Sequence, residues 1–134
     1  MSAKEGSMHA DGALLYVRDV ARAAAFYRSQ FGFRETAVRG AEFAVVELDG
    51  WRLYLHRDPE KFGGNLAGLG ERTTRGDGVV LHFRVDEVDG WAHRFESAGH
   101  PISRKPANTP YGLRECYVYD PDGYNLVVFT QMRR

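Results

Sequence analysis

The chain has 134 residues, which fits a single domain or two small modules that share a core. Its 18 basic and 18 acidic side chains cancel to a formal net charge of zero, which argues against a nucleic-acid-binding protein. No apolar run approaches the roughly 20 residues that a membrane-spanning helix needs. We therefore expect neither nucleic acid nor a membrane as a partner.

The single cysteine and the N-terminal stretch bear on the cellular location. Cys116 has no partner for an internal disulfide, and strand alternation places it on the same face as Val118. We expect a buried, inert thiol in a reducing compartment rather than a nucleophile. Residues 1–12 are polar and lack an apolar signal core, so they are interpreted as a flexible arm of a cytoplasmic protein.

Residues 13–57 predict a first β-α-β-β-β unit. A short strand over residues 14–17 precedes Asp19, which can cap a helix. The apolar spacing of one helical face then follows at Val20, Ala24, Tyr27 and Phe31. Gly32 ends this helix. Three strands are expected after it, with a turn at Asp49-Gly50, over residues 33–38, 41–48 and 51–56.

Residues 58–78 break this pattern with six glycines and Pro59, and are interpreted either as a linker or as a mobile flap over a site. A second unit follows over residues 79–134. It starts with a strand over residues 79–85 and a helix from Val88 to the stop at Gly99. Residues 101–112 are expected to be irregular, with a short strand at 102–104 as an option. Strands over 113–119 and 124–130 complete the unit.

The last two strands flank the turn sequence Asp120-Pro121-Asp122-Gly123. Pro121 fixes φ and Gly123 accepts a positive φ, so a tight turn is expected. The two aspartates are interpreted as acceptors for backbone N–H groups of this turn rather than as an acid–base pair. One face of the hairpin carries aromatic residues where a solvent-facing strand would carry charges, which indicates that something lies against it.

The second unit repeats the first. Val17, Val20, Ala24 and Tyr27 recur 68 positions later as Val85, Val88, Ala92 and Phe95. Asp49-Gly50 recurs 73 positions later as Asp122-Gly123. We therefore predict an α+β fold of two βαβββ modules, related by a pseudo-twofold axis, whose sheets form a curled half-barrel. The helices would cover the convex face, and the inner face would line a groove for a small ligand.

Strand alternation assigns a mixed set of residues to this inner face. The candidate ligand-binding residues are Tyr16, Arg52, Tyr54, His56, His82, Tyr117, Tyr119 and Phe129. Gly12, Leu14, Val80, Arg84, Glu115 and Val127 belong to the same face. The rings can stack on a flat ligand, and tyrosine and phenylalanine also attract cations. The alternative is that this face is the filled core of a tightly closed barrel.

Three segments resemble the vicinal oxygen chelate superfamily. They are V-R-D-V-A-R-A-A-A-F-Y-R-S-Q-F-G-F (17–33), P-Y-G-L-R-E (110–115) and D-P-D-G-Y-N-L-V-V-F (120–129), and the match spans about residues 13–131. This superfamily holds glyoxalase I, extradiol dioxygenases, fosfomycin-resistance enzymes and bleomycin-resistance proteins. The resemblance therefore implies a fold and not one particular reaction.

The resemblance also implies where a metal would bind. Metal-dependent members hold a divalent ion at four inner positions, which correspond here to Gly12, Tyr54, Val80 and Val127. Such an ion needs carboxylate, imidazole or thiolate ligands, and none of these four residues supplies one. The chain thus resembles bleomycin-resistance proteins, which are homodimers that sequester a small aromatic or cationic antibiotic without chemistry. No metal or other cofactor is expected.

Two other functions remain open. One is a lyase, isomerase or dioxygenase with a shifted metal site of His56, His82 and Glu115, because two histidines and a carboxylate bind non-haem iron. A metal-free catalyst that uses Tyr54, His82 or Glu115 as acid or base belongs to the same class. The other is an interaction subunit that has kept the fold and binds no ligand.

Overall fold

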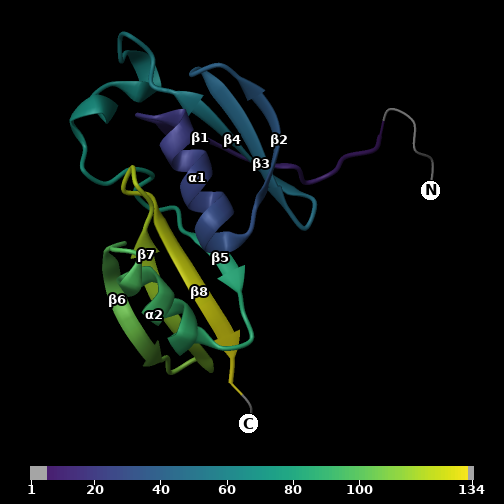
Figure 1. The fold of residues 1–134 in the computed structure, drawn as a ribbon, viewed down its shortest axis with the longest axis vertical. Coiled ribbons are helices and arrows are strands. Elements are labelled where there is room, and N and C mark those ends of the chain that lie inside the picture. The colour runs from purple at the N-terminus through teal and green to yellow at the C-terminus, as the bar shows by residue number, and fades with distance from the viewer. Residues whose placement is uncertain (1–5, 133–134) are drawn as a thin grey trace. The chain divides into compact units, whose positions relative to one another are not determined.

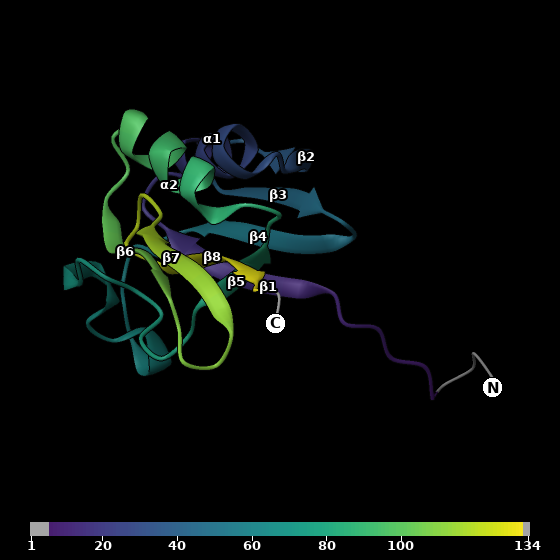
Figure 2. The same cartoon turned by 90° about the horizontal axis from the view of Figure 1, so that it is seen from below.

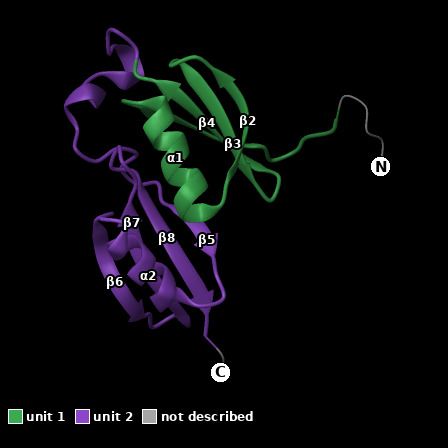
Figure 3. Cartoon of the chain, in the orientation of Figure 1, with its two compact units in different colours: residues 1–58 green, residues 59–134 purple. Residues whose placement is uncertain are grey.

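The computed structural model describes residues 6–132, and it contains two four-stranded sheets, each with a helix packed against it (Figure 1 and Figure 2). The chain divides into two compact units, Met1–Asp58 and Pro59–Arg134 (Figure 3). Each unit has the order β-α-β-β-β, so the predicted α+β fold of two such modules is confirmed. The first five residues of the expected arm lie outside the described residues.

Unit 1 is built around a mixed sheet. Its elements are β1 (Gly12–Val17), α1 (Val20–Phe31), β2 (Arg34–Arg39), β3 (Phe43–Leu48) and β4 (Trp51–Arg57). The strand order is β1-β4-β3-β2, with β1 parallel to β4 and the other neighbours antiparallel. As expected, the Asp19 carboxylate caps α1 by accepting from the Arg22 N–H at 3.1 Å. Gly32 ends the helix in the left-handed region, at a φ of 77°.

Unit 2 has the same arrangement. After two short 3₁₀ helices, η1 (Gly64–Leu66) and η2 (Leu69–Glu71), it contains β5 (Leu81–Arg84), α2 (Val88–Ser97), β6 (Ile102–Asn108), β7 (Leu113–Tyr119) and β8 (Asn125–Gln131). The strand order is β5-β8-β7-β6, and β5 is parallel to β8. No helix among residues 6–132 is long and apolar enough to cross a membrane.

The strand register supports the internal repeat. Leu14 pairs with Tyr54 in unit 1. The positions 68 residues after Leu14 and 73 residues after Tyr54 are His82 and Val127, and these two residues pair in unit 2. The offsets found in the sequence therefore hold at the level of individual strand pairs.

Each helix covers one face of its own sheet. In unit 1, α1 contacts β3 and β4, and in unit 2, α2 contacts β6, β7 and β8. The strand residues on these faces are buried: Leu15, Val17, Leu53 and Leu55 in unit 1, and Leu81, Cys116, Val118, Leu126 and Val128 in unit 2. Burying one such large apolar side chain contributes about 1.5–3 kcal/mol, so this face stabilises each unit. The expected burial of Cys116 is confirmed.

Two expectations about strands in unit 2 are corrected. The optional short strand at 102–104 is present, and it continues to Asn108 as β6 through residues that were expected to be irregular. This is possible because β6 is an edge strand, where Pro106 need not donate to a neighbour. The pairing of β6 with β7 shifts register on both sides of Arg104, so β6 follows an irregular course along β7. The strand expected over residues 79–85 is shorter, since Val79 is 61% exposed and only Leu81–Arg84 pair with β8.

The Asp120-Pro121-Asp122-Gly123 turn adopts the expected geometry. The Asp120 carboxylate accepts from the N–H groups of Asp122 at 2.8 Å and Tyr124 at 3.0 Å. Gly123 has a φ of 85°, and its carbonyl oxygen accepts from the Arg75 N–H at 3.1 Å. A Cβ atom at Gly123 would lie 2.1 Å from the Thr73 carbonyl oxygen. The turn therefore holds the end of the glycine-rich segment by a close backbone contact, which a free linker would lack.

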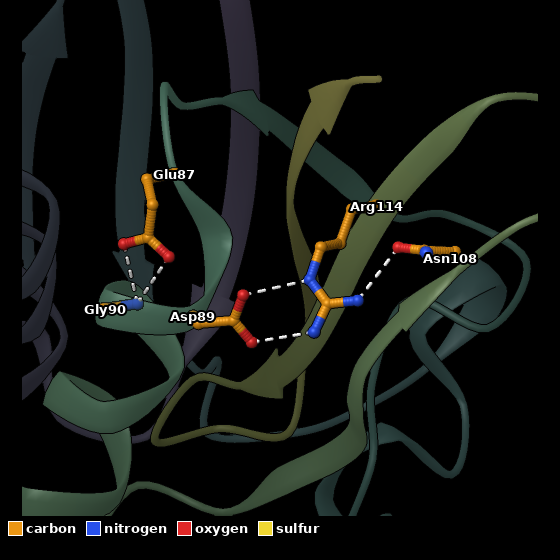
Figure 4. A network of polar contacts seen from close by, with 5 residues as sticks. All are labelled: Glu87, Asp89, Gly90, Asn108 and Arg114. Carbon is orange, nitrogen blue, oxygen red and sulfur yellow. Dashed lines mark hydrogen bonds and ion pairs between the residues drawn. The ribbon is translucent and has the colours of Figure 1, made fainter. Parts of the chain in front are cut away.

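A polar network joins α2 to two strands of its sheet (Figure 4). The Glu87 carboxylate caps α2 by accepting from the Gly90 N–H at 2.9 and 3.1 Å. Arg114 on β7 donates two hydrogen bonds to Asp89, at 2.9 and 2.8 Å, and one to the Asn108 side chain at 2.8 Å (Figure 4). This bidentate pairing fixes the first turn of α2 over the sheet.

Candidate ligand-binding faces

The face of the first sheet that α1 leaves uncovered is aromatic. Tyr16 on β1 and His56 on β4 meet edge to face, with ring centroids 5.5 Å apart. Phe43 on β3 lies 6.3 Å from the His56 ring and stacks 6.2 Å from the Tyr54 ring. All four side chains are half-buried, so part of each ring is open to a ligand. We call these four residues the unit 1 aromatic face.

Phe43 was not among the sequence-predicted site residues. The signal that could have found it is the Asp49-Gly50 turn, because this turn pairs Leu48 with Trp51 and thereby places Phe43 opposite His56. The same register places Glu47 beside Arg52 on this face.

A cluster of charged side chains lies at one end of the unit 1 aromatic face, next to Tyr54. Arg52 and Tyr54 both donate hydrogen bonds to the Asp11 carboxylate, and Arg52 also lies 3.8 Å from Glu47. The hydrogen bond to Asp11 raises the pKa of Tyr54 above its usual value, and the same bond lowers the pKa of Asp11. Tyr54 is therefore a protonated donor at neutral pH. Asp11 was missed because it was assigned to the arm.

The uncovered face of the second sheet is also aromatic, and it carries an arginine. His82 on β5 meets Phe129 on β8 edge to face, with centroids 5.5 Å apart. The guanidinium carbon of Arg104 on β6 lies 5.2 Å from the centroid of the Tyr117 ring. Tyr117 borders a shallow hollow of about 270 Å³, which we call the Tyr117 hollow and which is lined by Ser103, Arg104, Tyr117, Tyr119 and Asn125.

Two residues expected to line a groove are instead buried. Val127 is fully buried, and Glu115 is 3% exposed. The Glu115 carboxylate accepts a hydrogen bond from the Tyr111 hydroxyl group at 3.1 Å, which satisfies it inside the protein. Alternation predicted their face correctly, but it does not predict how far neighbouring side chains cover a position.

The eight candidate residues divide equally between the units. Tyr16, Arg52, Tyr54 and His56 share the uncovered face in unit 1, and His82, Tyr117, Tyr119 and Phe129 share it in unit 2. His56 belongs to a different unit from His82 and Glu115, so the shifted metal site is not a feature of either unit. Among residues 6–132, no three His, Cys, Asp or Glu side chains are placed to hold a metal ion.

The four positions at which the resemblance places metal ligands do not fit a divalent ion. A Cβ atom at Gly12 would lie 1.8 Å from the Arg52 carbonyl oxygen, so the β1–β4 pairing leaves no room for any side chain there. Tyr54 is neutral and already bonded to Asp11. Val80 and Val127 have no donor atoms in their side chains, and Val127 is fully buried.

The fold and its register define a class of protein built from two βαβββ modules. A sequence profile described as the Glyoxalase/Bleomycin resistance protein/Dioxygenase superfamily matches residues 9–128. This match spans most of the chain, and the chain belongs to this superfamily. A search of curated proteins gave no match.

Solved structures of other proteins share the fold. A lactoylglutathione lyase from Agrobacterium tumefaciens is 24% identical, with a TM-score of 0.70 over 94% of this chain and 96% of the other. A family enzyme from Burkholderia phytofirmans PsJN is 22% identical, with a TM-score of 0.76 over 93% and 100%. A member from Nocardioides is 20% identical, with a TM-score of 0.74 over 98% and 88%. At these identities the likeness concerns the fold alone.

Proposed function

We propose that this protein binds a small aromatic or polycyclic molecule without a metal ion and without chemistry, as bleomycin-resistance proteins do. The observation that carries the proposal is that the four expected metal positions hold residues that cannot bind a metal ion, whereas aromatic side chains on the same faces are open to a ligand. Gly12, Tyr54, Val80 and Val127 stand at the metal positions, and the aromatic residues around them remain half-buried. An aromatic contact contributes about 0.5–1.5 kcal/mol beyond the area that it buries.

The proposal includes a homodimer in the cytoplasm. It is supported by the resemblance to dimeric members of the superfamily and by the exposed apolar side chains of Leu14 and Val38, which are 48% and 59% exposed. The free, buried Cys116 suits a reducing compartment. Sedimentation equilibrium of the purified chain tests the dimer, since a monomer at all concentrations would refute this part.

The binding proposal is tested by titrating the metal-free protein with a panel of aromatic and polycyclic compounds while following intrinsic fluorescence. We expect saturable binding of at least one compound. Tyr117→Ala should weaken it about tenfold, because stacking on an aromatic platform is lost. Tyr117→Phe, which keeps the ring, should bind like the wild type. Circular dichroism should show that all three proteins are equally folded.

Two results would refute the proposal. One is the absence of any response across the panel, which would favour an interaction subunit without a ligand. The other is unfolding of the Tyr117→Ala variant, which would show that Tyr117 belongs to the core.

An enzyme remains the second candidate, and His82 is the residue that favours it. Its side chain is exposed, and its Nδ1 lies 3.4 Å from the Val80 carbonyl oxygen. In the tautomer that donates this contact from Nδ1, the Nε2 atom has an open lone pair that can accept a proton. Tyr54 is less suited because its pKa is raised, and Glu115 is buried. A lyase assay with lactoylglutathione tests this candidate, since activity that is lost in His82→Gln would replace the binding proposal.

A further inference from the structure

The Tyr117 hollow presents hydrogen-bond donors to a ligand. Within residues 6–132 the guanidinium group of Arg104 forms no hydrogen bond or ion pair, and its contact is with the Tyr117 ring. The Asn125 carbonyl oxygen accepts from the Ser103 hydroxyl group at 3.2 Å, so the amide group of Asn125 turns its N–H donors away from Ser103. One side of the hollow therefore offers several N–H groups beside two tyrosine rings.

The carboxylates near the hollow are already satisfied. Glu115 is buried and accepts from the Tyr111 hydroxyl group, and Asp120 is buried and accepts from two backbone N–H groups. Neither forms a hydrogen bond or an ion pair with Arg104. By contrast, Arg52 and Arg114, which lie on strands of the two sheets, are paired with Asp11 and Asp89. The exposed guanidinium group of Arg104 is thus open to a ligand.

From this arrangement we propose that the Tyr117 hollow binds the carboxylate of a planar aromatic acid. The carboxylate would accept from Arg104 and Asn125, and the ring would lie against Tyr117 and Tyr119. Arginine is suited to this role because its planar fork of donors matches the two oxygen atoms of a carboxylate. This inference rests on the proposed binding function and assigns the ligand an anionic class, whereas the sequence analysis expected an aromatic or cationic ligand.

The size of the hollow limits the ligand. Drug-sized molecules occupy sites of about 300–1,000 Å³. A hollow of about 270 Å³ therefore suits one or two fused rings, either as a whole ligand or as the acidic end of a larger one. The test compounds are matched accordingly: 2-naphthoate as the anion, 2-naphthamide as the neutral form, and 2-naphthylmethylammonium as the cation.

The experiment measures the affinity of each compound for the wild type, Arg104→Gln and Lys105→Gln by calorimetry. Lys105 is the matched control, because it lies next to Arg104 on β6 but lines a different hollow beside α2. We expect 2-naphthoate to bind at least tenfold more tightly than the other two compounds. Arg104→Gln should remove this preference, Lys105→Gln should keep it, and added salt should weaken it.

The outcomes separate the two proposals. Equal binding of all three compounds would overturn the anionic class, and a preference that survives in Arg104→Gln would overturn the assignment of the carboxylate to Arg104. Both results would leave the binding function standing. Tighter binding of the ammonium compound would also overturn the anionic class and would show that the hollow prefers a cation. Failure of all three compounds, together with failure of the wider aromatic panel, would overturn both. Backbone amide shifts confined to β6, β7 and the start of β8 on adding 2-naphthoate would confirm that the ligand lies in the Tyr117 hollow.

Discussion

The Tyr54 hydroxyl group donates a hydrogen bond to the Asp11 carboxylate, at one of the four positions where metal-dependent members of the superfamily hold an ion. The bond has an electrostatic consequence in both directions, since it raises the pKa of Tyr54 and lowers that of Asp11. Arg52 completes the group by pairing with the same carboxylate. Tyr54, to which the resemblance assigns a metal position, is thus part of a local polar cluster beside the start of β1.

The Asp11–Tyr54 bond predicts a change in tyrosine titration. The raised pKa of Tyr54 means that the bond stabilises the fold below pH 10 and that this contribution is lost as the pH rises through the folded pKa. In Asp11→Asn the pKa of Tyr54 should fall back toward 10. NMR titration of ring-labelled tyrosine measures it, with Tyr54→Phe to assign the signal. An unchanged titration in Asp11→Asn would contradict the bond.

The contact between Gly123 and Thr73 predicts an unequal pair of glycine variants. Gly123 and Gly78 both have a φ of 85°, but only Gly123 has a neighbouring backbone within 4 Å of an added Cβ atom. Gly78→Ala should cost about 1–2 kcal/mol from the left-handed backbone alone. Gly123→Ala should cost about 2–4 kcal/mol, because overpacking adds to the same strain. Urea unfolding measures both, and equal losses would show that the turn does not hold the glycine-rich segment.

The burial of Cys116 predicts that its thiol reacts slowly with disulfide reagents. Burial raises its pKa to about 11, and Glu96 and Asp89 add to the effect. Because the thiolate is the reacting form, the folded protein should react with a disulfide reagent at pH 8 roughly a hundredfold more slowly than the urea-unfolded chain. Comparable rates for the two states would argue for an exposed, reactive cysteine and against the core position described here.

The Arg114–Asp89 pair predicts how α2 responds to acid. The hydrogen bonds from Arg114 lower the pKa of Asp89 below 3.8, so the pair stabilises the fold above that pH and is lost as the pH falls through the lowered pKa. Arg114→Gln should therefore be less stable than the wild type at neutral pH, and the difference should shrink below about pH 4. Urea unfolding from pH 3 to 7 measures it. A difference independent of pH would assign the loss to packing.

Much of the fold follows from local patterns in the sequence. Asp19, Gly32 and the Asp120–Gly123 turn were predictable because a cap, a left-handed stop and a tight turn each depend on neighbouring residues. The edge strand β6 was not predictable, because three prolines indicate a break and only the sheet order shows that Pro106 faces no partner.

The site was less predictable than the fold. Alternation found the rings of Tyr16, Tyr54 and Tyr117, because the face of a strand residue follows from its position alone. It could not find Asp11 or the Arg104–Tyr117 contact, since both depend on side chains that meet from separate segments. It also could not show that Glu115 is buried, because burial depends on Tyr111 and other residues outside its strand.

The most direct test of the central claim, that the ligand binds to side chains alone, combines metal content and affinity in one preparation. The untagged protein is dialysed against iron, zinc, manganese or nickel, its metal content is determined by mass spectrometry, and its affinity for 2-naphthoate is measured with and without a chelator. The account predicts substoichiometric metal in every case and an affinity that the chelator does not change. One tightly held ion per chain, with binding that is lost when the ion is removed, would contradict it.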